Sequence, residues 1–319
     1  FPTRRSSDLL VQTSGLVSVT ASAGVLQFNG TALTQSFTVN AVNGIATFTG
    51  LGFTSGVNSS QTLVFTSDAF IATSMVVSPN SYPANVNIAN GVTTQGTFLG
   101  GQFYATSGTG TTNIRASDLM RHMASFSTVI SASGNINVAA DVTTSATASL
   151  TLRANGSISL SATVDIQLNG GDLVIWSDSD NNGAGYIRAE ETVVLNTVAG
   201  STTAITGGGD LYLAGGLDSN GDGLPDGYAR SVAGLNNGDA IQLGRENSAS
   251  AFAAYSGGGD LVVKGQSSRR IGINLLGQMI FESGNGRLII EALSTSTTNA
   301  DGGNAHAATH TQSGHAVTQ

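Results

Sequence analysis

Five residues within a span of nine, in the middle of the chain, have the types and spacing of a calcium-binding loop. Positions 1, 3, 5 and 9 carry carboxylate or amide oxygens, and position 7 offers a backbone carbonyl. Gly223 at position 6 permits the sharp turn that lets these groups converge. Three carboxylates this close repel one another unless a cation offsets their charge. The candidate ligands are Asp218, Asn220, Asp222, Leu224 and Asp226.

This loop departs from the EF-hand pattern, because position 12 is Ala229 rather than a bidentate Glu. It is more similar to the compact calcium loops of thrombospondin type 3 repeats. Calcium prefers 6–8 oxygens and the loop supplies about five, so water or a neighbouring segment must complete the shell. We expect a dissociation constant on the order of 10⁻⁴ to 10⁻³ M, which suits extracellular calcium. The alternative is an exposed Asp/Gly turn without metal.

A second loop, with fewer ligands, is a weaker candidate for the same chemistry. Asp178, Asp180 and Asn182 occupy positions 1, 3 and 5, and Gly183 follows at position 6. Tyr186 at position 9 supplies no carboxylate, so three side chains are available. Both loops follow a Gly-Asp-apolar strand and end in Gly-Tyr, so we interpret them as one insertion present in two repeats.

The signs of catalysis are few. The chain has no H-E-x-x-H, G-x-S-x-G or G-K-[ST] motif. His122 falls on a short predicted helix, and the other histidines lie in a polar terminal segment. The charges that a polysaccharide-cleaving site would need are interpreted as solvated loop positions, and Trp176 as a cover for the strands rather than a sugar platform. We therefore predict no enzyme activity. The histidines of the terminal segment are His306, His310 and His315, and the charged residues interpreted as loop positions are Arg188, Glu190, Glu191, Arg269 and Arg270.

These loops are attached to a repeat in which a turn residue or glycine precedes an apolar-polar-apolar triplet. The copies are 15 to 50 residues apart, and constant strands with variable loops are typical of a parallel β-helix. Residues 115–295 would form about seven coils of roughly 25 residues. A small antiparallel sandwich is the competing fold. The copies begin at Gly134, Gly156, Gly171, Gly209, Gly259 and Gly286.

Two of these copies carry a more specific resemblance. The segments 151–158 and 170–180, the latter continuing to 185–187, resemble filamentous-haemagglutinin-type and autotransporter-like β-strand repeat proteins. The resemblance covers about residues 110–290. It implies a right-handed β-helix in a large secreted or surface-anchored bacterial protein, often an adhesin. It also implies an extracellular or cell-surface location and a host-cell, matrix or glycan surface as partner.

The segment 10–79 alternates apolar and polar residues in short runs joined by Asn29-Gly30 and Asn43-Gly44, which are strong hairpin signals. The stretch 37–51 resembles the bacterial Ig-like modules of surface adhesins, which implies an Ig-like β-sandwich used as a spacer. A generic β-sandwich is the alternative. Two prolines at Pro79 and Pro83 indicate a domain boundary.

The remaining segments have simpler interpretations. Residues 80–114 are predicted to be a linker or a capping strand, and residues 116–123 a short helix capped by Ser117. Residues 296–319 are predicted to be a flexible polar tail. Residues 1–9 resemble translated sequencing-adapter DNA, so we set them aside and expect the natural N-terminus to be missing.

Composition limits the function classes further. Charged residues make up 10% of the 319, glycine accounts for 42 and cysteine is absent. The formal net charge of −8 argues against nucleic-acid binding, which needs a basic face. No apolar run approaches the 18 residues of a membrane span. We therefore predict an all-β, non-catalytic fragment of an adhesin-like bacterial surface protein with calcium-stabilised loops. A carbohydrate-active β-helix enzyme or a carbohydrate-binding module is the alternative.

Overall fold

The structure is a computed structural model, and it divides the chain into two compact units, Phe1–Ser81 and Tyr82–Gln319. Each unit is described by itself. The residues that the structure describes are 14–21, 26–28, 31–32, 36–42, 51–53, 61–67, 70–77, 83–105, 110–200, 206–231, 238–245, 251–294, 308–313 and 316–318.

The described strands of the first unit form two antiparallel sheets. One has the order β4-β1-β6-β7 and the other β3-β2-β5. Phe28 pairs with Thr31, so β2 and β3 are antiparallel neighbours, as the predicted hairpin requires. The predicted hairpin at 43–44 and the strand after it lie outside the described residues. The strands are β1 (Ser14–Ala21), β2 (Leu26–Phe28), β3 (Thr31–Ala32), β4 (Phe37–Val42), β5 (Leu51–Phe53), β6 (Gln61–Ser67) and β7 (Phe70–Val77).

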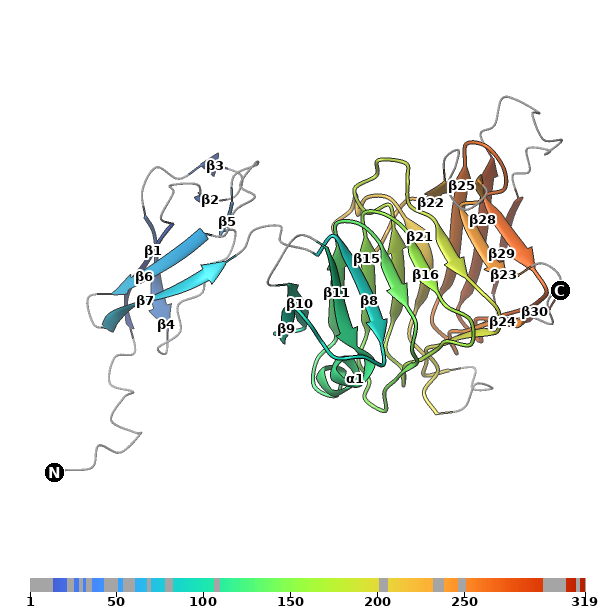
Figure 1. Cartoon of the computed structure of the whole chain (residues 1–319), viewed down its shortest axis with the longest axis horizontal. Coiled ribbons are helices and arrows are strands. Elements are labelled where there is room, and N and C mark those ends of the chain that lie inside the picture. The colour runs from blue at the N-terminus through green and yellow to red at the C-terminus, as the bar shows by residue number, and fades with distance from the viewer. Residues whose placement is uncertain are drawn as a thin grey trace. The chain divides into compact units, whose positions relative to one another are not determined.

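The second unit contains three large sheets that the chain visits in turn (Figure 1). A ten-stranded sheet contains β9 (Gly96–Leu99), β10 (Gln102–Ala105), β12 (Thr128–Ala132), β15 (Leu150–Ala154), β18 (Leu173–Ser177), β21 (Leu211–Gly215), β22 (Ala229–Ser231), β25 (Leu261–Ser267), β28 (Arg287–Ser294) and β29 (Ala308–Ser313).

A seven-stranded sheet contains β8 (Asn85–Ala89), β11 (Thr111–Arg115), β13 (Ile136–Val138), β16 (Ile158–Leu160), β19 (Ile187–Ala189), β23 (Ile241–Gly244) and β26 (Ile273–Leu276). A six-stranded sheet contains β14 (Val142–Thr143), β17 (Asp165–Gln167), β20 (Val193–Asn196), β24 (Ala251–Tyr255), β27 (Gln278–Glu282) and β30 (Ala316–Thr318). All strand counts refer to the described residues.

Each pass of the chain through the three sheets forms one coil, and successive coils pair strand on strand in parallel. After β12, β13 and β14, the chain returns to the ten-stranded sheet as β15, whose Leu150 pairs with Thr128. Five complete coils follow one another from β12 to β27 in the described residues. The parallel pairing contradicts the antiparallel sandwich that the sequence left open for these repeats.

The coils share one apolar core. The inward residues of β15, β18, β21 and β25 are aliphatic and fully buried. Each such side chain contributes about 1.5–3 kcal/mol on burial, and a single coil could not bury its own apolar face. Stability therefore comes from stacking. The residues are Leu150, Leu152, Leu173, Ile175, Leu211, Leu213, Leu261 and Val263.

The glycines that lie just before β18, β21, β25 and β28 of the ten-stranded sheet allow the coils to approach closely. A Cβ atom on Gly209 would collide with the backbone of Gly171 and Asp172 in the preceding coil. A Cβ on Gly259 would collide with Gly209 in the same way. The recurring glycine in the sequence is thus a requirement of backbone packing.

The repeats were predicted as one series, but the structure distributes them over two sheets. The copies at Gly134 and Gly156 become β13 and β16 of the seven-stranded sheet, and the other four enter the ten-stranded sheet. Two coils are long, because 38 residues separate Leu173 from its partner Leu211 and 50 separate Leu211 from Leu261. For this reason the described chain has five complete coils, where the sequence predicted about seven.

The short helix α1 (Ala116–Met123) has its predicted bounds and buries Ala116, Leu119 and Met123. It packs against β11 and β14. The predicted capping role of Ser117 is wrong. The helix begins at Ala116, so Ser117 lies within its first turn and not at the capping position, and no side chain of the described residues caps the N-terminus.

Segments at both ends of the second unit join its sheets. The segment 80–114 contributes β8, which pairs in parallel with β11 and β13, and the antiparallel pair β9–β10. In the segment predicted to be a flexible tail, β29 and β30 pair antiparallel with β28 and β27. The flexible-tail prediction is therefore wrong for 308–313 and 316–318, because edge pairing uses backbone groups and needs no apolar sequence.

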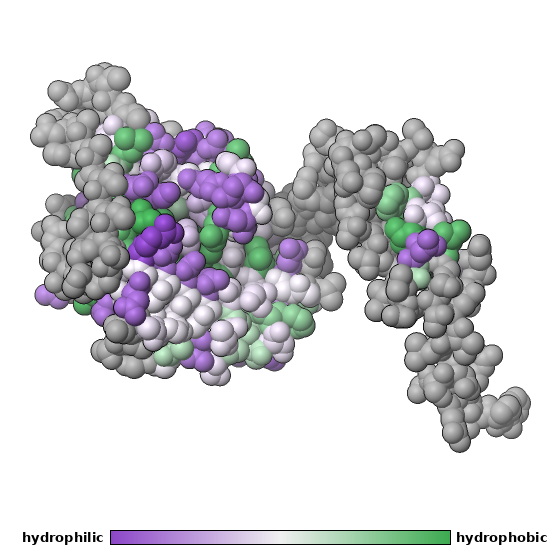
Figure 2. Space-filling view, turned by 180° about the vertical axis from the view of Figure 1, so that it is seen from behind, coloured by the Kyte–Doolittle hydropathy of each residue, from purple (hydrophilic) through white to green (hydrophobic). Residues whose placement is uncertain are grey.

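The described surface reflects the low charge of the chain. Figure 2 shows a face of the second unit on which hydrophilic clusters lie among pale residues of intermediate hydropathy and small apolar patches. Within the described ranges, no helical segment reaches the length and hydropathy of a membrane span.

Candidate functional site

The first predicted calcium loop, residues 218–226, follows β21 and is held by hydrogen bonds to its carboxylates. Asp218 Oδ1 accepts from the backbone N–H groups of Gly221 and Asp222, at 2.6 and 3.1 Å, and its Oδ2 accepts from that of Gly223 at 2.9 Å. Asn220 Nδ2 donates to Asp222 Oδ2 at 3.0 Å and to Asp226 Oδ1 at 3.2 Å. The structure thus brings together the four predicted ligand side chains.

The two remaining carboxylate oxygens of this loop are satisfied as well. Asp222 Oδ1 accepts from the N–H of Leu224, the predicted carbonyl ligand, at 2.9 Å. Asp226 Oδ2 accepts from the N–H groups of Ser219 and Asn220 at 2.6 and 3.2 Å. All six carboxylate oxygens therefore have a protein donor, and a cation would have to compete with these donors.

The second predicted loop, residues 178–184, is built differently. Asp178 follows directly on Ser177, the last residue of β18, and its side chain is fully buried. Its Oδ1 accepts from the backbone N–H groups of Gly183 and Ala184 at 2.9 and 3.3 Å. Its Oδ2 is buried and has no hydrogen-bond partner among the residues that the structure describes. Burial raises the pKa of the Asp178 carboxyl, and the hydrogen bonds from Gly183 and Ala184 oppose that rise.

The other two predicted ligands of this loop are exposed and bonded to each other. Asn182 donates to both oxygens of Asp180, from its backbone N–H at 3.3 Å and from Nδ2 at 2.9 Å. Arg230 Nη1 donates to Asn181 Oδ1 at 2.8 Å, so this guanidinium lies at the same loop. The loop therefore collects one buried and one exposed carboxylate with amide oxygens.

The two loops lie next to each other in adjacent coils, as expected of one insertion present twice. Ser177 pairs with Gly215, so both insertions start from the same end of neighbouring strands. Gly185 and Arg230, near the ends of the two insertions, exchange two backbone hydrogen bonds of 2.9 and 2.8 Å. Asp178 comes one residue after the paired position and Asp218 three residues after it, which explains why Asp178 is the more deeply buried.

Among the described residues, no three His, Cys, Asp or Glu side chains cluster in a way that could hold a metal ion. A cation at either loop would therefore rely on amide, carbonyl or water oxygens in addition to carboxylates.

A row of carboxylates along the ten-stranded sheet is a feature that the sequence interpretation missed. Three Gly-Asp dipeptides place an aspartate at the same position of successive coils, and each aspartate accepts a hydrogen bond from the backbone N–H at that position in the next coil. Asp172 Oδ1 accepts from the N–H of Asp210 at 2.8 Å, and Asp210 Oδ1 from the N–H of Asp260 at 2.7 Å. Asp260 Oδ1 accepts from the N–H of Arg287 at 3.0 Å, and its Oδ2 forms an ion pair with the Arg287 guanidinium. We call Asp172, Asp210, Asp260 and Arg287 the carboxylate ladder.

The members of the ladder differ in their electrostatics. Burial raises the pKa of Asp210, and the charges of Asp172 and Asp260 add to the rise. The hydrogen bond from Arg287 lowers the pKa of Asp260. Burial, with a contribution from Asp210, raises the pKa of Tyr212 to about 12. The signal in the sequence was the shared Gly-Asp dipeptide, but stacking became visible only with the register.

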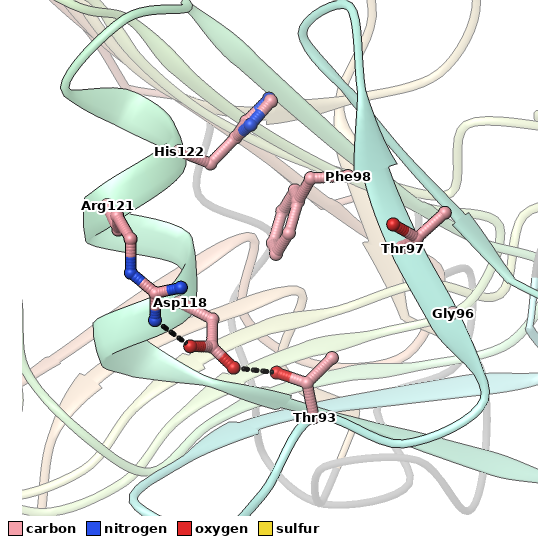
Figure 3. A pocket seen from close by; sticks show the side chains of 7 residues that line it. All are labelled: Thr93, Gly96, Thr97, Phe98, Asp118, Arg121 and His122. Carbon is pink, nitrogen blue, oxygen red and sulfur yellow. Dashed lines mark hydrogen bonds and ion pairs between the residues drawn. The ribbon is translucent and has the colours of Figure 1, made fainter.

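A pocket of about 380 Å³ lies beside α1 (Figure 3). Thr93 Oγ1 donates to Asp118 Oδ2 at 2.6 Å, and Asp118 Oδ1 forms an ion pair with Arg121. The Thr93 hydrogen bond lowers the pKa of Asp118. The pocket is lined by Thr93, Gly96, Thr97, Phe98, Asp118, Arg121 and His122.

Aromatic stacking fixes His122 at this pocket. Its ring stacks on Phe98 and Phe126, with centroids 4.7 and 5.1 Å away. Burial lowers the pKa of His122, and its Nε2 is buried with no hydrogen-bond partner among the described residues. The Thr93 hydroxyl and the Arg121 guanidinium both stabilise the ionised form of Asp118 and lower its pKa, so Asp118 is a weak base toward the Thr93 hydroxyl. The pocket can hold a small polar ligand.

The other residues considered for catalysis form surface ion pairs or turns. Arg188 Nε lies 3.8 Å from Glu190 Oε1, and Arg245 Nη1 lies 3.2 Å from Glu191 Oε1. Ser267 Oγ accepts from the backbone N–H groups of Arg269 and Arg270 in the turn after β25. His306 and His315, and the side chain of His310, lie outside the described residues.

Trp176 covers the sheet. It is buried, and its Nε1 donates to the carbonyl oxygen of Gly216 at 2.7 Å. The guanidinium carbon of Arg153 lies 4.6 Å from the centre of the Trp176 ring. Because the Trp176 ring is buried, it is not accessible for stacking against a sugar.

These observations define an all-β protein whose second unit is built from mainly parallel sheets. No protein-family model matches the chain, and the comparisons with curated proteins and with solved structures give no match either.

Proposed function

We propose that the chain is a non-catalytic rod segment of an adhesin-like protein on the bacterial cell surface or secreted from it. In this proposal residues 82–294 form a right-handed parallel β-helix and the first unit is an Ig-like spacer. The handedness, the Ig-like identity and the adhesive role rest on the sequence resemblance. The single observation that carries the proposal is the in-register stacking of five coils around one aliphatic core.

Stacked coils suit a rod because each coil needs only its two neighbours. Loops can then vary at the rim without disturbing the strands. The long insertions after β18 and β21 occupy such positions. The partner in this proposal is a host-cell, matrix or glycan surface.

The test compares adhesion with turnover. The purified full chain is applied to host-cell monolayers and to immobilised glycans, and incubated separately with a panel of soluble polysaccharides. Retention without release of new reducing or unsaturated ends supports the proposal. Release of such ends, abolished by Asp118→Asn, would overturn it in favour of an enzyme.

Calcium at the loop 218–226 is part of the proposal. Calcium should raise the melting temperature. Asp222→Ala should remove the part of that rise that appears only at millimolar calcium concentrations. A site filled to ten times its dissociation constant adds about 1.4 kcal/mol to the free energy of unfolding. Thermal unfolding in chelator and in 10 mM calcium measures the change, and equal melting temperatures in both would defeat the proposal for this loop.

The pocket beside α1 favours a second candidate, a carbohydrate-binding module. Its Asp118–Arg121 pair, its hydroxyls and the Phe98 ring are groups that recognise polar small molecules. Saturation-transfer NMR with monosaccharides, using the full chain and Arg121→Ala, tests it. Binding that Arg121→Ala abolishes supports this candidate, whereas binding that persists in the variant contradicts it.

A further inference from the structure

Asp178 has a buried carboxylate oxygen that receives no hydrogen bond from the described part of the chain. The side chain is fully buried, and its Oδ1 already accepts two backbone hydrogen bonds from within the loop. Its Oδ2 is equally buried and accepts no hydrogen bond within the described ranges. Removing a carboxylate oxygen from water without a donor or a cation is costly, so such an oxygen calls for an explanation.

The cationic side chain at this loop is engaged with an amide. Arg230 Nη1 donates to Asn181 Oδ1 at 2.8 Å, and Arg230 Nε donates to Gln266 Oε1 at 3.0 Å. Arg230 therefore contributes to the electrostatic field at Asp178 without forming a hydrogen bond to Oδ2.

The two Oδ1 hydrogen bonds hold the carboxylate inside the loop that also carries Asp180 and Asn182. In the loop 218–226, by contrast, every carboxylate oxygen has a protein donor. A hard divalent cation, which prefers oxygen ligands, would satisfy the oxygen that is left over.

We propose that the loop 178–184 binds one calcium ion through Oδ2 of Asp178, with Asp180 and Asn182 as further ligands, more tightly than the loop 218–226. Water completes the shell. This inference deepens the proposed function and rests on its calcium-stabilised rod, but it places the stronger site in the loop with fewer candidate ligands.

The experiment uses the full chain after removal of divalent ions with a chelator. Calcium chloride is titrated calorimetrically into the wild type, Asp178→Asn and the matched variant Asp218→Asn. The wild type should show a tighter and a weaker binding event, separated by at least about tenfold in dissociation constant. Asp178→Asn should lose the tighter event, and Asp218→Asn should lose the weaker one.

Thermal unfolding gives a second readout that a purely structural role would not produce. In chelator, Asp178→Asn should melt at or above the wild-type temperature, because it removes a buried charge. In calcium the order should reverse. A wild type and an Asp178→Asn variant with the same calcium-induced shift would overturn the inference.

The outcomes separate this inference from the calcium part of the proposed function. A single event lost in Asp218→Asn but kept in Asp178→Asn sinks the inference and leaves the loop 218–226 standing. No calcium binding by the wild type sinks both. Should Asp178→Asn fail to fold by circular dichroism, the exposed double variant Asp180→Ala/Asn182→Ala takes its place, and an undiminished tighter event in it contradicts the inference.

Discussion

Asp210 stands in the middle of the carboxylate ladder, with Asp172 on one side and Asp260 on the other. Its charge is disfavoured by burial and by both neighbours, whereas Arg287 favours the charge of Asp260. Two chemically identical residues in adjacent coils therefore make opposite contributions to stability at neutral pH.

Replacing Asp210 by Asn should raise the melting temperature at pH 7. The raised pKa means that ionised Asp210 costs stability, and this cost grows as the pH rises above the ordinary Asp pKa of about 3.9. The amide oxygen of Asn can still accept from the N–H of Asp260. At about pH 3 the carboxyl is protonated, so the variant and the wild type should melt alike.

Asp260→Asn is the matched control, with the opposite sign. The lowered pKa of Asp260 means that its charge stabilises the fold above its ordinary pKa, and this stability is lost as the pH falls through the folded pKa. The variant should melt below the wild type at pH 7. Thermal unfolding followed by circular dichroism at both pH values measures both variants, and a gain for Asp260→Asn would contradict the ladder electrostatics.

At this scale the sequence predicted where candidate ligands lie, and the structure brings together the ligand side chains of the loop 218–226 and, in the loop 178–184, Asp180 and Asn182. The sequence could not predict the burial of Asp178, because the strand register, which pairs Ser177 with Gly215, sets how far each Asp lies from the sheet. Nor could it predict the pocket, since Thr93 and Asp118 are 25 residues apart and meet through α1 packing.

At the scale of elements, the parallel strands depend on the glycines that precede them. These positions lie where one coil passes over the backbone of another, and the approach leaves no room for a Cβ atom at Gly209. The constraint is steric, so it should not depend on pH or salt.

Gly209→Ala should lower the free energy of unfolding by about 1–3 kcal/mol, the usual cost of overpacking. Gly91→Ala is the control, because nothing lies within 4 Å of a Cβ placed there. Its effect should stay within about 0.5 kcal/mol. Urea denaturation of both variants decides the point, and similar effects at the two positions would argue against coil contact as the reason for the glycine.

Several elements could be predicted because their signals are local. The helix α1 and the hairpin of β2 and β3 follow from residues adjacent in sequence. The assignment of a triplet to one sheet or another could not be predicted, since Gly156-Ser157-Ile158 and Gly171-Asp172-Leu173 look alike and differ only in where the chain turns. The strands β29 and β30 were not predicted, because their pairing depends on the free backbone groups of the edge strands β28 and β27 and not on a pattern in their own sequence.

At the scale of the whole molecule, the two compact units have their own sheets. The aliphatic core of the second unit runs through all five coils. Damage to one coil should therefore lower the stability of that unit and leave the first unit unaffected.

Leu213→Ala should destabilise the second unit by about 2–5 kcal/mol, because Leu213 is fully buried between Ile175 and Val263 in the stack. Leu217 is 49% exposed, and Leu217→Ala should cost less than about 0.5 kcal/mol. Differential scanning calorimetry can follow the two units as separate transitions. Equal shifts from both variants would contradict a shared core.

The described residues contain five complete coils instead of about seven, because the prediction divided the sequence length by an average repeat. The insertions at 178–185 and 216–228 consume residues without adding strands to the core. The fold class could still be predicted, since alternating patterns and glycine turns are present in every coil.

The carboxylate ladder sets a limit on how such a chain can lengthen during evolution. Duplicating a coil that carries Asp at this position adds another negative charge to a continuous line, and every added neighbour makes the interior members harder to ionise. The line can grow only if a basic or neutral residue interrupts it, as Arg287 does after three acidic coils and Ser149 does before them. Tandem duplication of this segment should thus be accompanied by substitution at this one position.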